Sequence, residues 1–204
     1  MASADRLVWI DCEMTGLDPK FDEIVEIACI VTDAELNELD EGITLVVKPG
    51  EESFAGMDDF VVNMHTVSGL IEEIPLGIAL ADVELAQAEQ QILEYIKKFV
   101  PNAKEAPLAG NTIGTDRMFL NKYMPELDQH LHYRNIDVSS IKELTRRWYP
   151  RVYFASPEKK GNHRALGDIR DSISELRYYR EAVFVPQPGP DSEAARALGA
   201  EHTS

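Results

Sequence analysis

Two carboxylates stand at the end of an apolar run near the N-terminus, in the segment LVWIDCEMTG over residues 7–16. On a strand, residues two apart point to the same face, so we expect Asp11 and Glu13 to lie side by side while Cys12 points away. Like charges this close raise the pKa of one group or require a cation. Oxygen ligands suit hard ions such as Mg²⁺ or Mn²⁺. A solvated strand end is the alternative, because short motifs often match by chance.

Three residues far downstream are candidates to complete such a site. Asp116, in GNTIGTDRMFL, falls in the first turn of a helix expected after a short strand; an acid there also complements the helix dipole. Asp168 lies at the edge of the apolar stripe of the last helix, from which its carboxylate can reach an open site. His163 is five residues earlier, which is not a same-face spacing. We expect it on the loop before that helix, although alone it would indicate only a surface histidine.

Taken together, the four carboxylates and the histidine predict a hydrolytic site. Four carboxylates balance the formal charge of two divalent ions, and such a pair activates water and stabilises the leaving oxygen of a phosphodiester. A neutral imidazole suits a general base that takes a proton from that water. We therefore predict a common site, with His163 as the base and a metal-binding set of Asp11, Glu13, Asp116 and Asp168.

Composition narrows the possible partners and compartments. The chain has 204 residues, a net charge of -16 and 44% hydrophobic residues, which indicates a single domain without the broad basic face that long nucleic acid requires. A short anionic ligand remains compatible with this charge. Cys12 and Cys29 lack CxxC spacing and are expected to be core residues in a reducing compartment. No leader pattern and no apolar run of bilayer length is present, so we expect a cytoplasmic protein.

Hydrophobic patterns predict an α/β domain with a mixed sheet. Three strands, over residues 6–12, 23–33 and 42–49, have short links and are expected to pair antiparallel. Residues 51–80 have short helical possibilities. The segment after residue 184 is rich in proline and small polar residues and is expected to be disordered. The other predicted elements are a helix over 82–100, a strand over 107–111, a helix over 114–124, a strand over 133–140, a helix over 141–148 with Ser139 as N-cap, and a last helix over 164–184.

A basic stretch leads up to His163. Residues 142–164 contain seven lysines and arginines but only two acids, Glu143 and Glu158. Such a run is usually a solvated face. Its position beside His163 also predicts a local electrostatic funnel for a short anionic substrate in an otherwise acidic protein.

The predicted set of four carboxylates and one histidine resembles that of the DEDDh exonucleases. In these enzymes a DxE ends the first strand, an Asp follows in mid-chain, and H-x4-D opens the last helix. The similarity is greater to the oligoribonucleases, through WIDCEMTGLDP, MDDFVVNMHTVSGL, GNTIGTDRMFL, HYRNIDVSS and HRALGDIRDSISELRYYR, and it extends from about residue 6 to 184. It implies a ribonuclease-H-like fold, with an exonuclease domain over residues 1–184 and a tail over 185–204. It implies a homodimer that hydrolyses very short RNA, especially dinucleotides, from 3′ to 5′ into nucleoside 5′-monophosphates.

The same resemblance implies roles for the five residues. Two divalent cations, Mg²⁺ or Mn²⁺, would be the cofactors. One would be held by Asp11, Glu13 and Asp168, and Asp11 would bridge to the second, with Asp116 nearby or acting through water. His163 would be the general base.

Three positions would hold the bases and the 5′ nucleotide, by the same resemblance. Leu17 would wedge against a base, Phe60 would stack near one, and His65 would help to hold the 5′ nucleotide. Phe60 departs from the family pattern, in which Trp is frequent. A purely structural role is the alternative at each: Leu17 and Phe60 as core residues, and His65 as a helix cap.

Four further positions would bind the 5′ phosphate. Thr112, standing where Ser is often found, would bind it from the same chain. Tyr133, Arg134 and Ser139 would reach it from the partner subunit and close a cap that measures substrate length. The alternative for Tyr133 and Arg134 is an ordinary surface pair.

Three other functions fit part of the pattern. An aspartyl phosphatase of the haloacid-dehalogenase type shares an acidic motif with DCEMT, but it needs Asp where Glu13 stands and gives His163 and Asp116 no role. A nucleotide-binding or scaffolding domain has no need of the complete five-residue set. A proofreading-type exonuclease would keep the chemistry but act on longer DNA, which the net acidity and the HYRNIDVSS segment disfavour.

Overall fold

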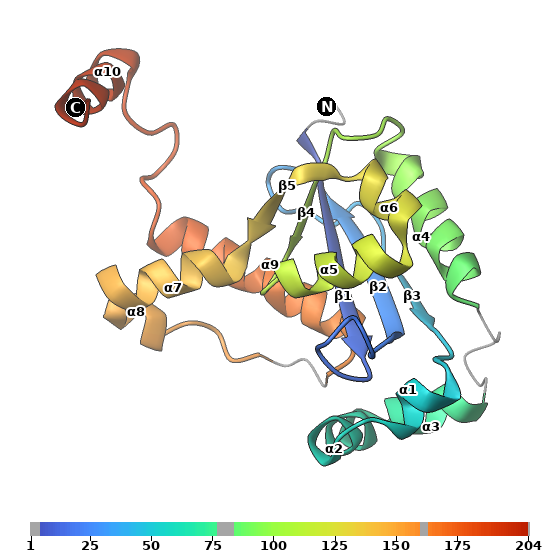
Figure 1. Cartoon of the computed structure of the whole chain (residues 1–204). Coiled ribbons are helices and arrows are strands. Elements are labelled where there is room, and N and C mark those ends of the chain that lie inside the picture. The colour runs from blue at the N-terminus through green and yellow to red at the C-terminus, as the bar shows by residue number, and fades with distance from the viewer. Residues whose placement is uncertain (1–4, 77–83, 160–162, 204) are drawn as a thin grey trace.

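A five-stranded mixed sheet forms the centre of the molecule (Figure 1). The structure is a computed structural model that describes residues 5–76, 84–159 and 163–203. The strands are β1 (Leu7–Met14), β2 (Ile24–Thr32), β3 (Ile43–Val46), β4 (Pro107–Gly110) and β5 (His132–Asp137).

The sheet has the strand order β3-β2-β1-β4-β5. β1, β2 and β3 pair antiparallel, as their short links predict, whereas β4 and β5 add to β1 in parallel after helical connections. β2 is buried along its whole length, which explains why its sequence is apolar on both faces. The predicted α/β class and mixed sheet are confirmed.

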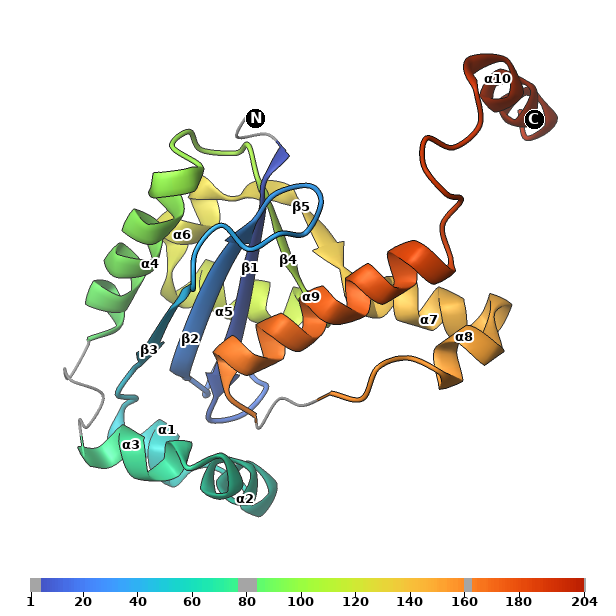
Figure 2. The ribbon, with the colours of Figure 1, turned by 180° about the vertical axis from the view of Figure 1, so that it is seen from behind.

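Helices cover both faces of this sheet (Figure 2). α4 (Leu85–Phe99), α5 (Gly114–Tyr123) and α6 (Pro125–His130) pack on one face, and α9 (Ala165–Ala182) packs on the other. The alternation along β1 sorts its side chains between the two cores. Ile10 and Cys12 face the core under α4 to α6, while Trp9 faces the core under α9.

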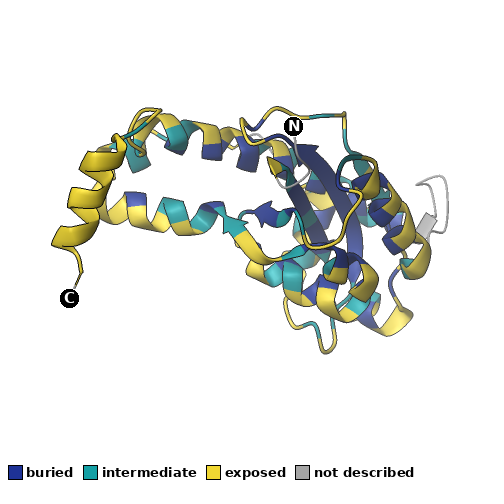
Figure 3. Cartoon of the chain, turned by 90° about the horizontal axis from the view of Figure 1, so that it is seen from above, coloured by how far each residue is buried: buried dark blue, intermediate teal, exposed yellow. Residues whose placement is uncertain are grey.

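Two groups of helices extend beyond the sheet (Figure 1). α1 (Glu51–Ala55), α2 (Asp59–Ser68) and α3 (Leu70–Leu76) lie near the end of β3. α7 (Val138–Trp148) and α8 (Pro150–Phe154) project sideways beside α9. Figure 3 shows that buried residues concentrate in the sheet, whereas the projecting helices are largely exposed on their outer sides. No helix in the three described ranges is long and apolar enough to cross a membrane.

Two details of the predicted elements are corrected. The N-cap of α7 is Asp137, whose side chain accepts the Ser139 backbone N–H, so Ser139 lies inside the helix. Part of the tail predicted to be disordered forms α10 (Ser192–Glu201), because Asp191 caps two backbone N–H groups ahead of an alanine-rich segment. Every residue of α10 is exposed. Residues 82 and 83, at the start of the helix predicted over residues 82–100, lie outside the described ranges.

Candidate active site

β1 carries two carboxylates to the face of the sheet that α9 covers. Asp11 and Glu13 alternate in phase with Trp9, which packs in the core beneath α9. In register on β2, Asp11 lies opposite Ala28 and Glu13 lies opposite Glu26. The apolar strand therefore ends in two acids that point to the same side, as the DxE spacing predicts.

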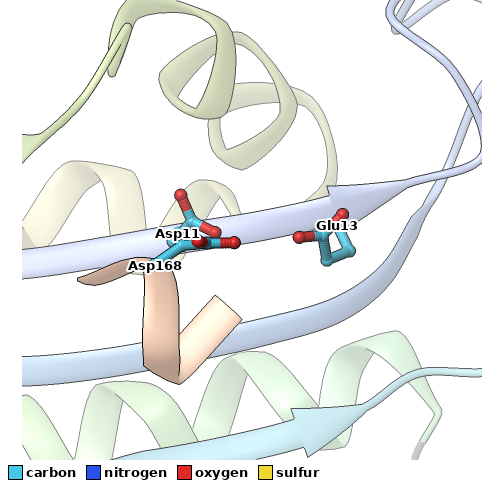
Figure 4. A group of neighbouring side chains, drawn as sticks. All are labelled: Asp11, Glu13 and Asp168. Carbon is cyan, nitrogen blue, oxygen red and sulfur yellow. The ribbon is translucent and has the colours of Figure 1, made fainter. Parts of the chain in front are cut away.

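The first turn of α9 brings a third carboxylate to this pair (Figure 4). One oxygen each of Asp11, Glu13 and Asp168 lie within 4.8 Å of one another. In Figure 4 the side chains of Asp11 and Asp168 lie close together, and Glu13 is farther along β1. Three acids from two elements 150 residues apart thus form one cluster.

Burial raises the pKa of every acid in this cluster, and the charges of neighbouring acids add to that effect. Burial raises the pKa of Glu13 to about 8, with Asp168 as the next cause. Burial also raises the pKa of Asp11 well above its usual range, followed by the charge of Asp116. Burial likewise raises the pKa of Asp168. Acids that are this costly to ionise together, with oxygens this close, fit a divalent cation, which would offset the repulsion.

Asp116 reaches the same pocket from the first turn of α5. Its carboxylate is buried, and one oxygen accepts the Cys12 backbone N–H at 3.0 Å. Burial raises its pKa to about 7, although that hydrogen bond acts in the opposite direction. Asp116 is not a member of the three-oxygen cluster, but its charge raises the pKa of Asp11.

These acids line a pocket of about 600 Å³ together with two residues at its mouth. Leu17, on the loop after β1, is 74% exposed. His163 is exposed and has a φ of 53°, a left-handed backbone conformation that is uncommon for a residue other than glycine. The other lining residues are Cys12, Met14, Asn111, Thr112, Thr115, Lys159 and Ser172.

Two hydroxyl groups stand at one edge of the pocket. The Thr112 backbone N–H donates to the Ser139 hydroxyl at 3.0 Å and also to Asp137, and the two hydroxyl oxygens lie 3.1 Å apart. Ser139 also donates to the side-chain oxygen of Asn111. Ser139 itself does not line the pocket, but it contacts two residues of its own chain that do, Asn111 and Thr112. Its predicted contribution to the site of a partner subunit stays a prediction.

Five predicted substrate-binding residues do not line the pocket: Ser139, which contacts Thr112 at its edge, and the four described next. His65 is fully buried, with its Nε2 atom 2.9 Å from the Met14 carbonyl oxygen, and burial lowers its pKa. Phe60, on α2, is exposed rather than part of the core. Tyr133 is also exposed, and the Arg134 guanidinium lies over its ring at 5.5 Å from the centroid.

The described part of the basic stretch before His163 carries less unpaired positive charge than the predicted electrostatic funnel requires. Arg164 forms ion pairs with Glu26 and Glu73, and most of the other cations that the structure describes there are also paired with acids. Lys159 does line the pocket, whereas Lys160 lies outside the described ranges. Asn111 is a lining residue that the sequence reasoning missed, and the available signal was a polar residue directly after a short buried strand.

A larger depression of about 820 Å³ lies at the end of α9, away from these acids. Phe184 and Val185 supply its apolar part. Both arginines in it already have partners, since Arg180 pairs with Glu35 and Arg177 donates to the Leu36 carbonyl. The converging carboxylates, rather than cavity size, identify the smaller pocket as the candidate active site.

Comparison with known proteins agrees with this site. A family model described as an exonuclease matches residues 8–176. An oligoribonuclease of Leifsonia xyli is 63% identical over 97% of this chain and 93% of its own length. The chain belongs to the oligoribonuclease family. Other members include the oligoribonucleases of Streptomyces coelicolor, at 59% identity over 97% of this chain and 96% of theirs, and Mycobacterium tuberculosis, at 55% over 97% and 90%.

Solved structures share the fold of this oligoribonuclease-family chain. Exonuclease I from Methylocaldum szegediense superposes with a TM-score of 0.61 at 22% identity over 87% of this chain. The zinc-bound complex of Escherichia coli exonuclease I with single-stranded DNA gives a TM-score of 0.64 at 14% identity over 88%. This chain spans 41% of each of those chains. The ribonuclease-H-like fold implied by the sequence resemblance is thus confirmed.

The oligoribonuclease-family membership and the site together define an enzyme of the nuclease class. The carboxylate cluster indicates a divalent cation as its cofactor. The haloacid-dehalogenase and non-enzymatic alternatives therefore do not apply to this chain.

Proposed function

We propose that this protein is a 3′-to-5′ exoribonuclease that hydrolyses very short oligoribonucleotides, especially dinucleotides, to nucleoside 5′-monophosphates. The observation that carries the proposal is the cluster of Asp11, Glu13 and Asp168, whose oxygens lie within 4.8 Å of one another. The cluster opens into a pocket with His163 and an exposed Leu17 at its mouth. The oligoribonuclease names of its relatives support the RNA substrate.

We further propose two divalent cations, Mg²⁺ or Mn²⁺, as cofactors. Asp11, Glu13 and Asp168 would hold one ion, and Asp11 would bridge to the second near Asp116. The raised pKa values of Asp11 and Glu13 support this, because burial and the neighbouring acids raise them despite the opposing charges of Lys159 and Arg164. Two such ions supply activation of water and stabilisation of a leaving oxygen.

His163 would act as the general base. It is exposed at the pocket mouth, where its imidazole can accept a proton from the attacking water. The water oxygen then joins phosphorus, and the bond from phosphorus to the 3′ oxygen of the preceding nucleotide breaks. The 3′-terminal nucleotide leaves with the phosphate on its 5′ oxygen, which gives a nucleoside 5′-monophosphate.

The other predicted residues would select a short substrate. Leu17 would wedge against a base and Phe60 would stack near one, which agrees with the exposure of both side chains. Thr112 would bind the 5′ phosphate from the same chain, and Ser139, whose hydroxyl contacts that of Thr112, would reach the 5′ phosphate in the site of the partner subunit. His65 would act more indirectly, because it is buried against the Met14 carbonyl, at the end of the strand that carries the acids.

A homodimer would complete the 5′-phosphate cap with Tyr133 and Arg134 of a second copy. Apolar side chains remain exposed on the projecting helices beside β5, and burying such a patch between copies is a common reason for association. They are Leu144, Trp148, Tyr149 and Phe154. Mixing inactive Tyr133→Ala and His163→Ala proteins tests this arrangement. Restored activity in the mixture supports a shared site, and absence of rescue contradicts it.

The substrate proposal is tested with 5′-phosphorylated RNAs of increasing length, starting from two nucleotides, in Mg²⁺ or Mn²⁺ and in chelator. We expect the dinucleotide to be hydrolysed fastest, with only nucleoside 5′-monophosphates formed and no turnover in chelator. A DNA series of the same lengths tests the proofreading-type alternative. Faster turnover of long DNA or long RNA than of the diribonucleotide would contradict the proposal.

A further inference from the structure

Arg164, the residue after His163, joins three elements around the start of α9. It is the N-cap residue of α9. Its Nε and Nη2 atoms donate to one oxygen of Glu26 on β2, at 3.0 and 2.7 Å. Its Nη1 and Nη2 atoms donate to the two oxygens of Glu73 on α3, at 2.8 and 2.9 Å. One planar guanidinium thus binds the sheet and the α3 helix at once.

Glu26 also binds the helix directly. Its second oxygen accepts the backbone N–H of Ala165, the first residue of α9, at 2.9 Å. The Glu26 side chain is only 1% exposed, and it lies in register with Glu13. A buried acid with both oxygens bonded is held firmly, so Glu26 fixes the start of α9 relative to the strand that carries Glu13.

His163 precedes Arg164 and Asp168 follows it, and both must be held in place for the site to form. His163 has a positive φ of 53°, a left-handed conformation that is unfavourable for a residue with a side chain. Asp168 lies one turn into α9, so a shift of the helix start displaces its carboxylate from the cluster. Neither residue is bonded directly by Arg164 through its side chain.

We propose that Arg164, clamped by Glu26 and Glu73, is a positioning residue that holds His163 and Asp168 in their places in the site. The proposal rests on the proposed function in that His163 and Asp168 serve the chemistry there. Arg164 does not line the pocket, so its effect reaches substrate through the residues that do.

If Arg164 acted only through its charge, removing it would change the cation affinity in the opposite direction from the change that loss of the clamp predicts. The positive charge of Arg164 lowers the pKa of Glu13, so the guanidinium is close enough to act on the cluster. Removing that charge leaves the acids more negative and, by Coulomb attraction alone, tightens cation binding. Removing the clamp instead releases Asp168 and weakens cation binding.

The test compares Arg164→Gln, Arg164→Lys and the unchanged protein. For Arg164→Gln we expect Mn²⁺ affinity, measured by calorimetry without substrate, to fall by about 10–100-fold. We expect kcat for a diribonucleotide to fall on a similar scale, with a smaller change in KM, and hydrogen exchange at residues 165–168 to become faster. Arg164→Lys restores the charge but not the planar fork, so it should remain impaired.

Two matched variants complete the design. Arg170→Gln removes the same charge from the same helix, where Arg170 pairs with Glu38 instead, and should leave all three readouts unchanged. Glu73→Gln breaks only the half-exposed outer arm of the clamp. It should give a smaller change in the same direction, and it serves as the deciding variant if Arg164→Gln does not fold.

The outcomes separate this proposal from the proposed function. Unchanged or tighter Mn²⁺ binding with unchanged exchange at residues 165–168 in Arg164→Gln overturns the clamp, as does full rescue by Arg164→Lys. Failure of the unchanged protein to hydrolyse any diribonucleotide overturns the proposed function. In that event Mn²⁺ affinity and exchange still decide whether Arg164 positions the start of α9.

Discussion

The two sides of the pocket mouth are held in different ways. The Leu17 side is a loop that folds on itself. The Asp22 carboxylate accepts the Thr15 hydroxyl at 3.1 Å and the Asp18 backbone N–H at 2.9 Å. The remote partners of this loop are Ser53, which contacts the Thr15 hydroxyl, and Lys122 and Tyr123 of α5, which donate to its carbonyl groups. This side is a local turn whose bonds mostly close within eight residues.

The His163 side is held by partners remote in sequence. Arg164 binds Glu26, 138 residues away, and Glu73, 91 residues away. A local turn re-forms quickly after a disturbance, whereas an edge held by distant pairs depends on the whole fold. We therefore expect substitutions on the His163 side to reduce the rate of hydrolysis, and substitutions on the Leu17 side to affect mainly substrate binding.

The largest effect is expected at the carboxylate cluster that both sides share. Asp11→Asn should lower the rate of diribonucleotide hydrolysis by on the order of 10³-fold or more, because a cation ligand is lost. In chelator the same variant should be more stable to heat, because it removes one of three repelling buried charges. Rate assays and thermal melts check both. Retained hydrolysis in excess Mg²⁺ would contradict the role of the cluster.

The next effect is expected at His163. His163→Ala should reduce kcat by roughly 10²–10⁴-fold with little change in KM, as expected for the loss of a general base. Steady-state kinetics with a diribonucleotide measure both constants, and His202→Ala, in the exposed C-terminal segment, is the control. A loss of only a few-fold would remove the role assigned to His163.

On the Leu17 side the effect should be smaller and of another kind. Asp22→Asn weakens the bonds that close the loop, by about 1 kcal/mol, so KM should rise roughly fivefold while kcat changes little. Asp18→Asn is the matched control on the same loop, because within the described residues its side chain accepts a single hydrogen bond, from the Lys20 backbone N–H. A fall in kcat with constant KM would show that both sides act alike.

The smallest expected effect is a pH dependence of stability in chelator. The pKa of Glu13 is about 8 in the folded protein against an ordinary 4.5. A raised folded pKa contributes stability that is complete below about pH 4.5 and is lost as pH rises through about 8. Thermal melts should therefore show Glu13→Gln gaining a few degrees over the unchanged protein toward pH 8 and above, and no gain at pH 4. Mn²⁺ should abolish the gain. An equal gain at every pH would contradict the burial of this charge.

The carboxylate site could be predicted from the sequence because its signals are local. The period of two in β1 places Asp11 beside Glu13, and the stripe of the last helix places Asp168 toward the sheet. The mixed sheet followed from short links and apolar runs. Asp116 was a candidate from its place in the first turn of a predicted helix, and the family resemblance supported it, because periodicity alone could not bring it to the same pocket.

The supports of the site could not be predicted, because they depend on pairs far apart in the chain. Arg164 counted in the sequence as one cation of a basic stretch, and only the fold shows that it is bound to Glu26 and Glu73. The positive φ of His163 has no sequence signal either, since glycine is absent there. The contact of Ser139 with Thr112 has no sequence signal for the same reason, because it joins the loop after β4 to α7.

The most direct test is anomalous diffraction from crystals grown with Mn²⁺ and a non-hydrolysable diribonucleotide. The account predicts manganese peaks in contact with Asp11, Glu13 and Asp168, with the scissile phosphate against them and His163 facing the phosphorus. Manganese bound elsewhere, or a diribonucleotide seated away from these carboxylates, would contradict it.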